Sequence, residues 1–219
     1  MEFGKDIKGV IFDIDGVLLD SMEIWTDLGE RYLRRRGKIP ETGLADILFS
    51  MSMEQGAAYL KNRYLPGQTC EDIMDGLQDM LRSFYYDEVK AKPGAGDLLK
   101  KLQDAEVRIT AATSSPRGHV EKALARNGLL VYIERIFTCS EIGASKHSPD
   151  IFNACADFMG VCRSEICVFE DSLYALKTAA ESGYHTVGIY DAKGETDQKG
   201  LQETAEIYIR DGMDYLSLL

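Results

Sequence analysis

Two aspartates separated by one residue follow a short apolar run near the start of the chain. Residues 9–12 read Gly-Val-Ile-Phe, and Asp13 and Asp15 come directly after them. An apolar run of this length is typical of a parallel strand buried on both faces. Because side chains alternate along a strand, Asp13 and Asp15 are predicted to share one face at its carboxyl end, where open α/β sheets bind ligands. The stretch therefore predicts an enzyme site.

Two structural readings compete with this one. A calcium-binding EF-hand loop also begins with alternating acids, but it requires an oxygen ligand at its fifth position and Glu at its twelfth. Those positions hold Val17 and Ile24 here, which excludes the loop. The two acids alone are also compatible with a solvated strand end. The rest of the sequence has to distinguish this alternative from an enzyme site.

Hydroxyl side chains end a second apolar segment. Thr113, Ser114 and Ser115 follow residues 107–112, and Pro116 then opens a helix. This junction places hydroxyl and backbone N–H donors beside a helix N-terminus, which suits a phosphate-bearing substrate. The alternative role for these hydroxyls is capping of the helix.

A lysine and a second pair of acids complete the set. Lys146 stands just before a helix led by Pro149, where it fits a fixed positive charge facing an anion or, alternatively, a surface lysine. Glu170 and Asp171 directly follow the apolar residues 166–169. Two strands that both end in acids occur together by chance more rarely than one such strand, which favours a site over a solvated strand end.

The acids of the two strands would repel one another if they met. Two unit charges about 4 Å apart repel by roughly 4 kcal/mol at an effective dielectric of about 20, so a divalent cation is expected among Asp13, Asp15, Glu170 and Asp171. The ligands offered are oxygens and none is a thiolate. Such a set predicts Mg²⁺.

The four segments together, in this order and spacing, resemble the four motifs of the haloacid dehalogenase superfamily. The closest subgroup is that of phosphatases and phosphomutases, which includes beta-phosphoglucomutase and phosphoglycolate phosphatase, and the resemblance covers nearly the whole chain. It implies that Asp13 is the nucleophile and Asp15 the general acid and base. It also implies that Thr113 and Lys146 bind the phosphoryl group.

The same resemblance implies the metal ligands. Mg²⁺ would be bound by Asp13, by Asp171 and by the backbone carbonyl of Asp15, with Glu170 ligating directly or through water. Dehalogenases of the superfamily lack the second acid of the first motif and need no metal. The presence of Asp15 therefore favours phosphoryl transfer through an aspartyl-phosphate.

The segment between the first and second motifs departs from the resembling mutases. These carry a Lys-Gly-x-Ser-Arg loop, whose counterpart here is residues 49–53, Phe-Ser-Met-Ser-Met, without either cation. Trp25 holds the position of an early histidine in those enzymes. Trp25 and Met51 are candidate substrate-binding residues, or alternatively core residues of this segment. A monophosphatase with an apolar leaving group is favoured; the alternatives are a phosphosugar mutase and a catalytically silent binding relative.

The fold class follows from the order of the elements. Residues 41–90 contain helical patterns and no convincing strand, whereas strands and helices alternate afterwards, which predicts a doubly wound parallel (Rossmann-like) α/β sheet. The predicted domains are a catalytic core of residues 1–17 and 90–219 and a helical cap of residues 18–89. The expected strands are 8–14, 107–112, 135–138, 166–169, 185–189 and 207–209. The expected helices are 21–36, 45–49, 53–64, 71–88, 95–104, 117–127, 149–159, 172–182 and 213–218, with 191–204 as a surface loop or short helix.

Composition limits the partners. The 219-residue chain carries a net charge of −11 with a pI near 4.8, which argues against a nucleic-acid or anionic-membrane partner and leaves a small phosphorylated metabolite. The five cysteines form no CxxC pair, so neither a zinc site nor a disulfide framework is indicated. Without a signal sequence or a membrane-spanning run, the expectation is a cytoplasmic protein, monomeric or weakly dimeric.

Overall fold

The chain forms two units in the computed structural model, which describes residues 6–49, 51–210 and 215. Residues before Met22 and after Glu88 make an α/β unit, and Met22–Glu88 make a helical unit. Residues 18–21 and Val89 lie in the α/β unit rather than in the helical insertion. Leu19 forms β-bridges with Asp15 and Ala91, and these bridges tie the connecting residues to the α/β unit.

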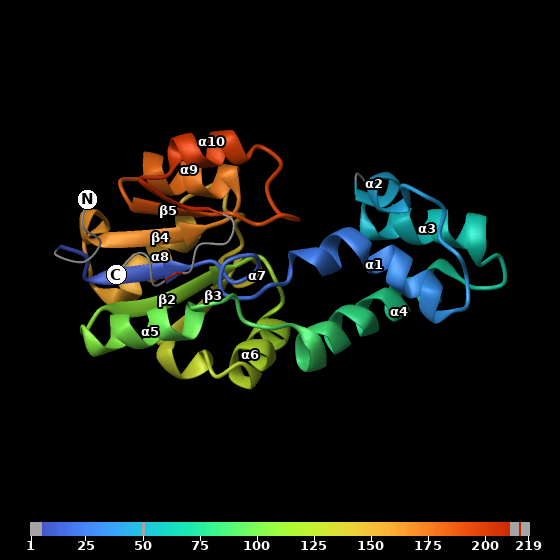
Figure 1. Ribbon diagram of the computed structural model, residues 1–219, viewed down its shortest axis with the longest axis horizontal. Helices are drawn as coiled ribbons and strands as arrows, with labels where there is room; N and C mark the ends of the chain where they lie inside the picture. Colours follow the sequence, from blue (N-terminus) through green and yellow to red (C-terminus); the bar gives the residue numbers. More distant parts are fainter. Residues whose placement is uncertain (1–5, 50, 211–214, 216–219) are drawn as a thin grey trace. The chain divides into compact units, whose positions relative to one another are not determined.

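Six parallel strands form one sheet in the order β3-β2-β1-β4-β5-β6 (Figure 1). The predicted doubly wound sheet is therefore confirmed. From β1 the chain continues to β2 and β3 on one side of the sheet and then returns to β4, β5 and β6 on the other side. The switch point at which such sheets bind ligands therefore lies between β1 and β4. The strands are β1 (Gly9–Phe12), β2 (Arg108–Thr113), β3 (Arg135–Thr138), β4 (Ile166–Glu170), β5 (His185–Ile189) and β6 (Ile207–Ile209).

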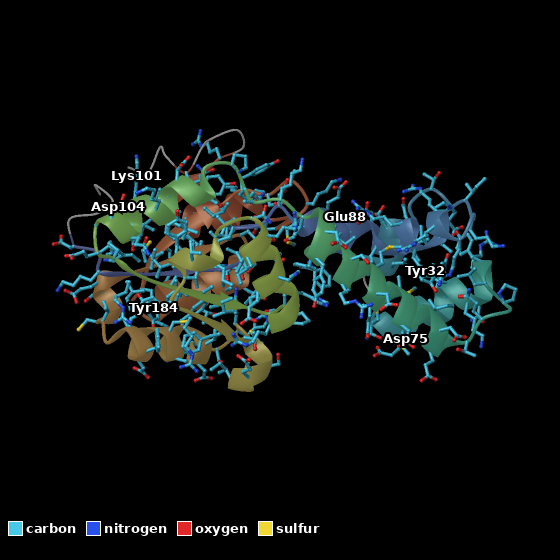
Figure 2. The ribbon with its side chains drawn as sticks, turned by 90° about the horizontal axis from the view of Figure 1, so that it is seen from below. Tyr32, Asp75, Glu88, Lys101, Asp104 and Tyr184 are labelled. Atoms are coloured by element: carbon cyan, nitrogen blue, oxygen red, sulfur yellow. The ribbon has the colours of Figure 1, made fainter. Side chains whose placement is uncertain are left out.

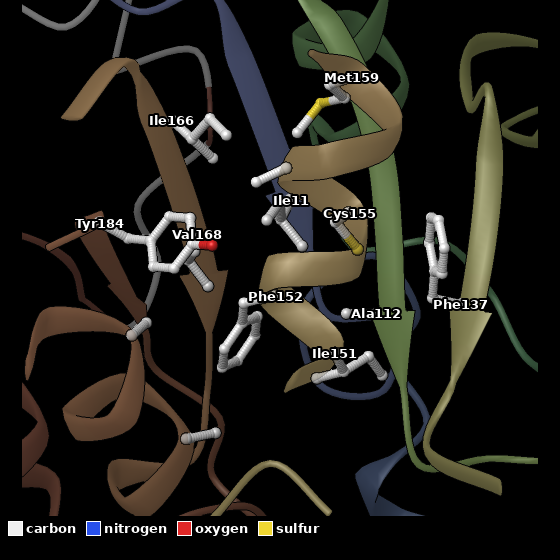
Figure 3. Packing of buried hydrophobic residues seen from close by; sticks show 13 residues of the cluster. Ile11, Ala112, Phe137, Ile151, Phe152, Cys155, Met159, Ile166, Val168 and Tyr184 are labelled. Carbon is white, nitrogen blue, oxygen red and sulfur yellow. The ribbon is translucent and has the colours of Figure 1, made fainter. Parts of the chain in front are cut away.

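Helices cover both faces of the sheet. On one face, α8 lays Phe152, Cys155 and Met159 against Ile11 of β1 and Val168 of β4, as Figure 3 shows, and α9 joins the same cluster. The helices of this unit are α5 (Ala95–Asp104), α6 (Arg117–Arg126), α7 (Cys139–Ile142), α8 (Asp150–Met159), α9 (Leu173–Glu181) and α10 (Gln198–Thr204).

The opposite face of the sheet carries the alternate residues of the strands. Val10 and Phe12 are fully buried and point away from Ile11 because side chains alternate along a strand. Helix α5 contacts β2. In Figure 2, Lys101 and Asp104 on α5 lie across the sheet from Tyr184, which belongs to the α8 cluster. Burial on both faces explains why the strands read as uninterrupted apolar runs.

The helical unit has its own core. The ring of Tyr32, labelled in Figure 2, occupies the space that a side chain at position 76 would need, since a Cβ on Gly76 would lie 2.5 Å from the ring. This close approach lets α1 pack against α4. The helices are α1 (Met22–Arg35), α2 (Leu44–Phe49), α3 (Met53–Tyr64) and α4 (Cys70–Ser83), which continues as a π-helical turn, Phe84–Glu88.

Some local elements differ from the sequence-based expectation. The four-residue helix α7 was not predicted; it begins because the Thr138 side chain accepts the backbone N–H of Glu141. The segment after β5 contains helix α10 preceded by a loop. The helical turn expected at 213–218 lies outside the described residues except for Tyr215. None of the described helices combines the length and apolarity needed to cross a membrane.

Candidate active site

Three carboxylates meet at the carboxyl end of the two central strands. Asp13 follows β1, and its backbone N–H donates to the carbonyl of Phe169 in β4 at 2.9 Å, which aligns the two strand ends. Glu170 ends β4 and Asp171 follows it. One oxygen from each of the three carboxylates lies within 4.8 Å of the others, and all three residues are buried. The structure thus brings together three of the four acids considered from the sequence.

Lys146 lies against this carboxylate group. It comes from the loop before α8, and its ammonium donates to Asp13 Oδ1 and, at 2.5 Å, to Glu170 Oε1. The Lys146 side chain is 3% exposed. Burial alone would lower the pKa of Lys146, but the carboxylates of Asp13 and Glu170 raise it above its ordinary value. Lys146 is therefore a buried ammonium paired with two carboxylates rather than the surface lysine that was the alternative.

Glu170 is held from two sides. While Oε1 accepts the Lys146 ammonium, Oε2 accepts the hydroxyl of Ser172 at 3.0 Å and the backbone N–H of Ser172 at 3.3 Å. Both oxygens of Glu170 thus have protein donors. This arrangement fixes the orientation of the carboxylate and, through it, the position of the Lys146 ammonium.

Within the described part of the chain, the ion pairs of the carboxylate group do not balance its charge. Three carboxylates share one ammonium, and each pair of unit charges within 4.8 Å repels by roughly 3–4 kcal/mol at an effective dielectric of about 20. Burial raises the pKa of Asp13 to about 8, although Lys146 opposes the rise. Burial, followed by repulsion from Asp13, also raises the pKa of Asp171. Closely spaced, buried carboxylate oxygens fit a hard divalent cation such as Mg²⁺.

The side chain of Asp15 stands outside the carboxylate group. Its Oδ1 accepts the hydroxyl of Ser21 at 2.6 Å, and its Oδ2 accepts the hydroxyl of Ser115 at 2.6 Å. Gly16, with φ of 77°, turns the backbone directly after Asp15. Two hydroxyls therefore orient the carboxylate of Asp15. The metal ligand expected from Asp15 is its backbone carbonyl oxygen and not this carboxylate.

The hydroxyls after β2 have different partners. Thr113 is fully buried, and its Oγ1 accepts the backbone N–H of Ser115 at 3.0 Å. The Ser115 hydroxyl donates to Asp15, and its contact with substrate stays a prediction. Ser114 is exposed, with its hydroxyl 3.4 Å from Cys139 Sγ. Only Ser115 is thus connected to the acids by a described hydrogen bond. Binding of a phosphoryl group by Thr113 and Ser114 stays a prediction.

The loop after β5 approaches the carboxylate group, which the sequence analysis did not predict. Asp191, only 5% exposed, accepts a hydrogen bond from Lys92 in the segment that returns from the helical unit. Glu195 accepts the backbone N–H of Leu173 at 2.9 Å and so caps α9 directly after the acids. Residues 191–204 were expected to form a surface loop or short helix; the short helix is α10, whereas the burial of Asp191 was not expected. The signal for Asp191 was its position two residues after the end of β5.

Gly194 in this loop is expected to be intolerant of a side chain. A Cβ at this position would lie 2.9 Å from Asp171 Oδ2 and 3.1 Å from Asp191 Cβ, so Asp171 would have to move. A substitution beside a metal-binding side chain that moves this side chain typically lowers metal affinity by about 10–100-fold. We expect Gly194→Ala to weaken Mg²⁺ binding by this factor in calorimetric titration. Gly67→Ala is the matched control, because nothing lies within 4 Å of its Cβ position; equal affinities in both variants would contradict the expectation.

Two aromatic rings lie beside Lys146. The exposed ring of His147 stacks on Tyr174 of α9 with centroids 4.2 Å apart. Neither ring belongs to the candidate site residues named from the sequence. Burial is the first cause of the raised pKa of Tyr174, and Glu170 is the second. Tyr174 therefore lies within electrostatic reach of the carboxylate group.

The two candidate residues of the helical unit line one cavity. Trp25 in α1 and Met51 between α2 and α3 both border a space of about 360 Å³ that is formed wholly by residues of this unit. Ser50, part of the loop compared with the mutases, lies outside the described residues. A contact of Trp25 or Met51 with substrate stays a prediction.

Comparisons with known proteins agree with this geometry. The family model of haloacid dehalogenase-like hydrolases matches residues 7–183. The phosphorylated carbohydrates phosphatase of Thermotoga maritima is 22% identical over 214 residues, covering 97% of this chain and 98% of that protein. The validoxylamine A 7'-phosphate phosphatase of Streptomyces hygroscopicus subsp. limoneus is 26% identical over 210 residues, 93% of each chain. A crystal structure of a beta-phosphoglucomutase candidate from Thermotoga maritima superposes with a TM-score of 0.83 at 22% identity, covering 93% of this chain and 94% of that one, which shows the shared fold.

Proposed function

The chain belongs to the haloacid dehalogenase-like hydrolase family, and from this premise we propose that it is a Mg²⁺-dependent phosphatase. The proposed reaction hydrolyses a small phosphorylated metabolite, a phosphate monoester, through an aspartyl-phosphate. The observation that carries the proposal is the buried group of Asp13, Glu170 and Asp171 with Lys146 bonded to two of them. The oriented carboxylate of Asp15 supplies the acid that the same reaction needs.

The metal would be held by Asp13 and Asp171, with the backbone carbonyl of Asp15 as a further ligand. Glu170, both of whose oxygens have protein donors, would act directly or through water. When bound, Mg²⁺ neutralises negative charge on the phosphoryl oxygens and on the nucleophile. Lys146 adds a fixed positive charge beside Asp13 for the same anion.

Asp13 performs the first chemical step. One of its carboxylate oxygens forms a bond to phosphorus while the bond from phosphorus to the ester oxygen breaks. Asp15 gives its proton to the departing oxygen, so that the alcohol leaves neutral. In the second step, Asp15 takes a proton from water as this water attacks phosphorus, releasing phosphate and restoring Asp13.

Asp15→Asn is expected to lower kcat by about 10²–10⁴-fold, the usual contribution of acid–base catalysis. Mg²⁺ affinity should stay the same, because the Asp15 side chain lies outside the carboxylate group and is bound by Ser21 and Ser115. Phosphate release from a panel of sugar, nucleotide and short-acid phosphates, together with calorimetric Mg²⁺ titration, measures both quantities. The control is Asp20→Asn, whose side chain is 68% exposed. A variant that keeps full turnover would refute the role of Asp15.

The helical unit is proposed to act as a cap that selects the organic part of the substrate. A phosphosugar mutase is the alternative reaction on the same core. The two are separated by incubating the enzyme with a hexose 1-phosphate, which a mutase isomerises and a phosphatase converts to free phosphate. The expectations of a cytoplasmic protein and of a monomer or weak homodimer stay predictions.

A further inference from the structure

The cavity of the helical unit has an apolar wall. It holds about 360 Å³, within the size range of small-molecule pockets. Side chains from α1, α2 and α3 and the turn between the last two supply most of the wall: Trp25, Leu28, Leu48, Met51, Met53 and Leu60. Methionine side chains adapt to the shape of an apolar guest, and the tryptophan ring offers it a flat apolar surface. The wall therefore favours a hydrocarbon surface.

The polar side chains of the wall already have partners inside the unit. The hydroxyl of Thr26 donates to the carbonyl of Glu23 at 2.9 Å, and the hydroxyl of Ser52 donates to Glu54 at 2.7 Å. Both hydroxyl hydrogens are thus occupied. A sugar or polyol entering the cavity would lose water without gaining a donor from these groups, and an uncompensated buried hydroxyl is costly.

The charge of the wall excludes a second phosphate. Among the residues the structure describes, neither Lys nor Arg lines the cavity, and its one charged side chain is Glu30, which is paired with Arg34 at 2.6 Å. The paired carboxylate offers an anionic guest no attraction, and none of the described lining residues supplies a cation. A neutral guest needs no cation.

The cavity is also tied to the catalytic acid by the covalent chain. The Ser21 hydroxyl binds the Asp15 carboxylate. Trp25 follows Ser21 by four residues, so that their Cα atoms are at most about 14 Å apart whatever the conformation of the chain between them. A lining residue of the cavity is therefore never farther than this along the chain from the residue that binds the Asp15 carboxylate.

We propose that this cavity binds a neutral apolar organic group, and that the substrate is the phosphate monoester of an apolar alcohol rather than a sugar phosphate or a bisphosphate. This inference rests on the phosphatase function proposed above and specifies its substrate class. The specificity-determining residues are Trp25, Met51 and their apolar neighbours in the wall.

A series of straight-chain alkyl monophosphates tests the proposal. Primary alkyl esters share nearly the same leaving-group chemistry, so a trend in kcat/KM with chain length reports binding of the chain. We expect kcat/KM to rise about fourfold for each added methylene until the cavity is filled. Hexyl phosphate should exceed the phosphate of a six-carbon sugar alcohol by at least about tenfold. A flat series, or a preference for the sugar-alcohol ester, would overturn the assignment.

Met51→Lys places a cation in the wall and is expected to flatten the chain-length trend. Ile39→Lys makes the same change in the same unit at a side chain that is 89% exposed and does not line the cavity. This control should keep the wild-type fourfold trend. Equal trends in the two variants would contradict the role of the cavity, and circular dichroism establishes that both are folded.

Binding has a second readout that does not depend on catalysis. Trp25 is the only tryptophan of the chain, so its fluorescence reports on the cavity. Titration of the full-length protein with hexan-1-ol should give a saturable change, and titration with sorbitol should give none. If esters are hydrolysed without a chain-length trend and hexan-1-ol does not bind, the apolar substrate class is refuted, whereas the phosphatase function is supported. If hexan-1-ol binds and no ester is hydrolysed, the phosphatase falls, and the substrate assignment falls with it.

Discussion

Replacing Asp13 with Asn is expected to abolish phosphate release while leaving the folded protein intact. An amide cannot form the phosphoryl bond that the proposed first step requires, and removing a catalytic nucleophile typically costs about 10⁶-fold in kcat. Turnover of hexyl phosphate and of a generic aryl phosphate should both fall below detection. Acid quenching of the wild-type enzyme should trap a phosphorylated protein that the Asp13→Asn variant does not form.

The stability of this variant separates a catalytic from a structural role. Asp13 lies in a group of three carboxylates that share one ammonium, so the neutral amide relieves repulsion from Glu170 and Asp171 while giving up the ion pair with Lys146. These effects oppose each other, and Lys146 keeps its bond to Glu170. We therefore expect the urea midpoint without Mg²⁺ to match that of Asp157→Asn, an exposed control on α8. Residual turnover by a folded Asp13 variant would refute the nucleophile assignment.

The fold was predictable because each of its elements leaves a local trace. Strands buried on both faces read as short apolar runs, and their alternation with helices specifies the parallel sheet. The three acids of the carboxylate group were predictable for the same reason, since Asp13 directly follows β1, Glu170 ends β4 and Asp171 follows it. The switch point between these strands then brings residues more than 150 positions apart to one place.

The partners of Asp15 were not predictable from local pattern. A hydroxyl near the start of a helix has one sequence signature whether it caps the helix, binds a phosphate or orients an acid. The structure gives the last role to Ser21 and Ser115, which are 6 and 100 residues from Asp15. Gly194 escaped notice because its constraint is a tertiary contact with Asp171. Contacts of this kind depend on the assembled sheet and leave no periodic trace.

Lys146→Met is expected to destabilise the protein strongly. The Lys146 ammonium is buried and bonded to Asp13 and Glu170, and its removal leaves carboxylates in the interior without their protein cation. Breaking a buried ion pair from one side costs about 3–5 kcal/mol of unfolding free energy. Urea unfolding in EDTA measures this loss. Lys101→Met, an exposed lysine on α5, should change the same quantity by no more than about 0.5 kcal/mol.

Two further measurements assign the loss to charge rather than to packing. Mg²⁺ should restore part of the stability of Lys146→Met, because a ligand that binds only the folded state stabilises it and supplies the missing positive charge. Adding Glu170→Gln to Lys146→Met should recover about 1–3 kcal/mol, since the second change removes one of the unpaired carboxylates. A packing defect would not respond to Glu170→Gln, because a methionine leaves the same space unfilled whether or not Glu170 is ionised, and Mg²⁺ would then stabilise Lys146→Met no more than it stabilises the wild type. Recovery in both experiments therefore identifies Lys146 as the fixed counter-charge of the carboxylate group, and recovery in neither would remove that role from the proposed mechanism.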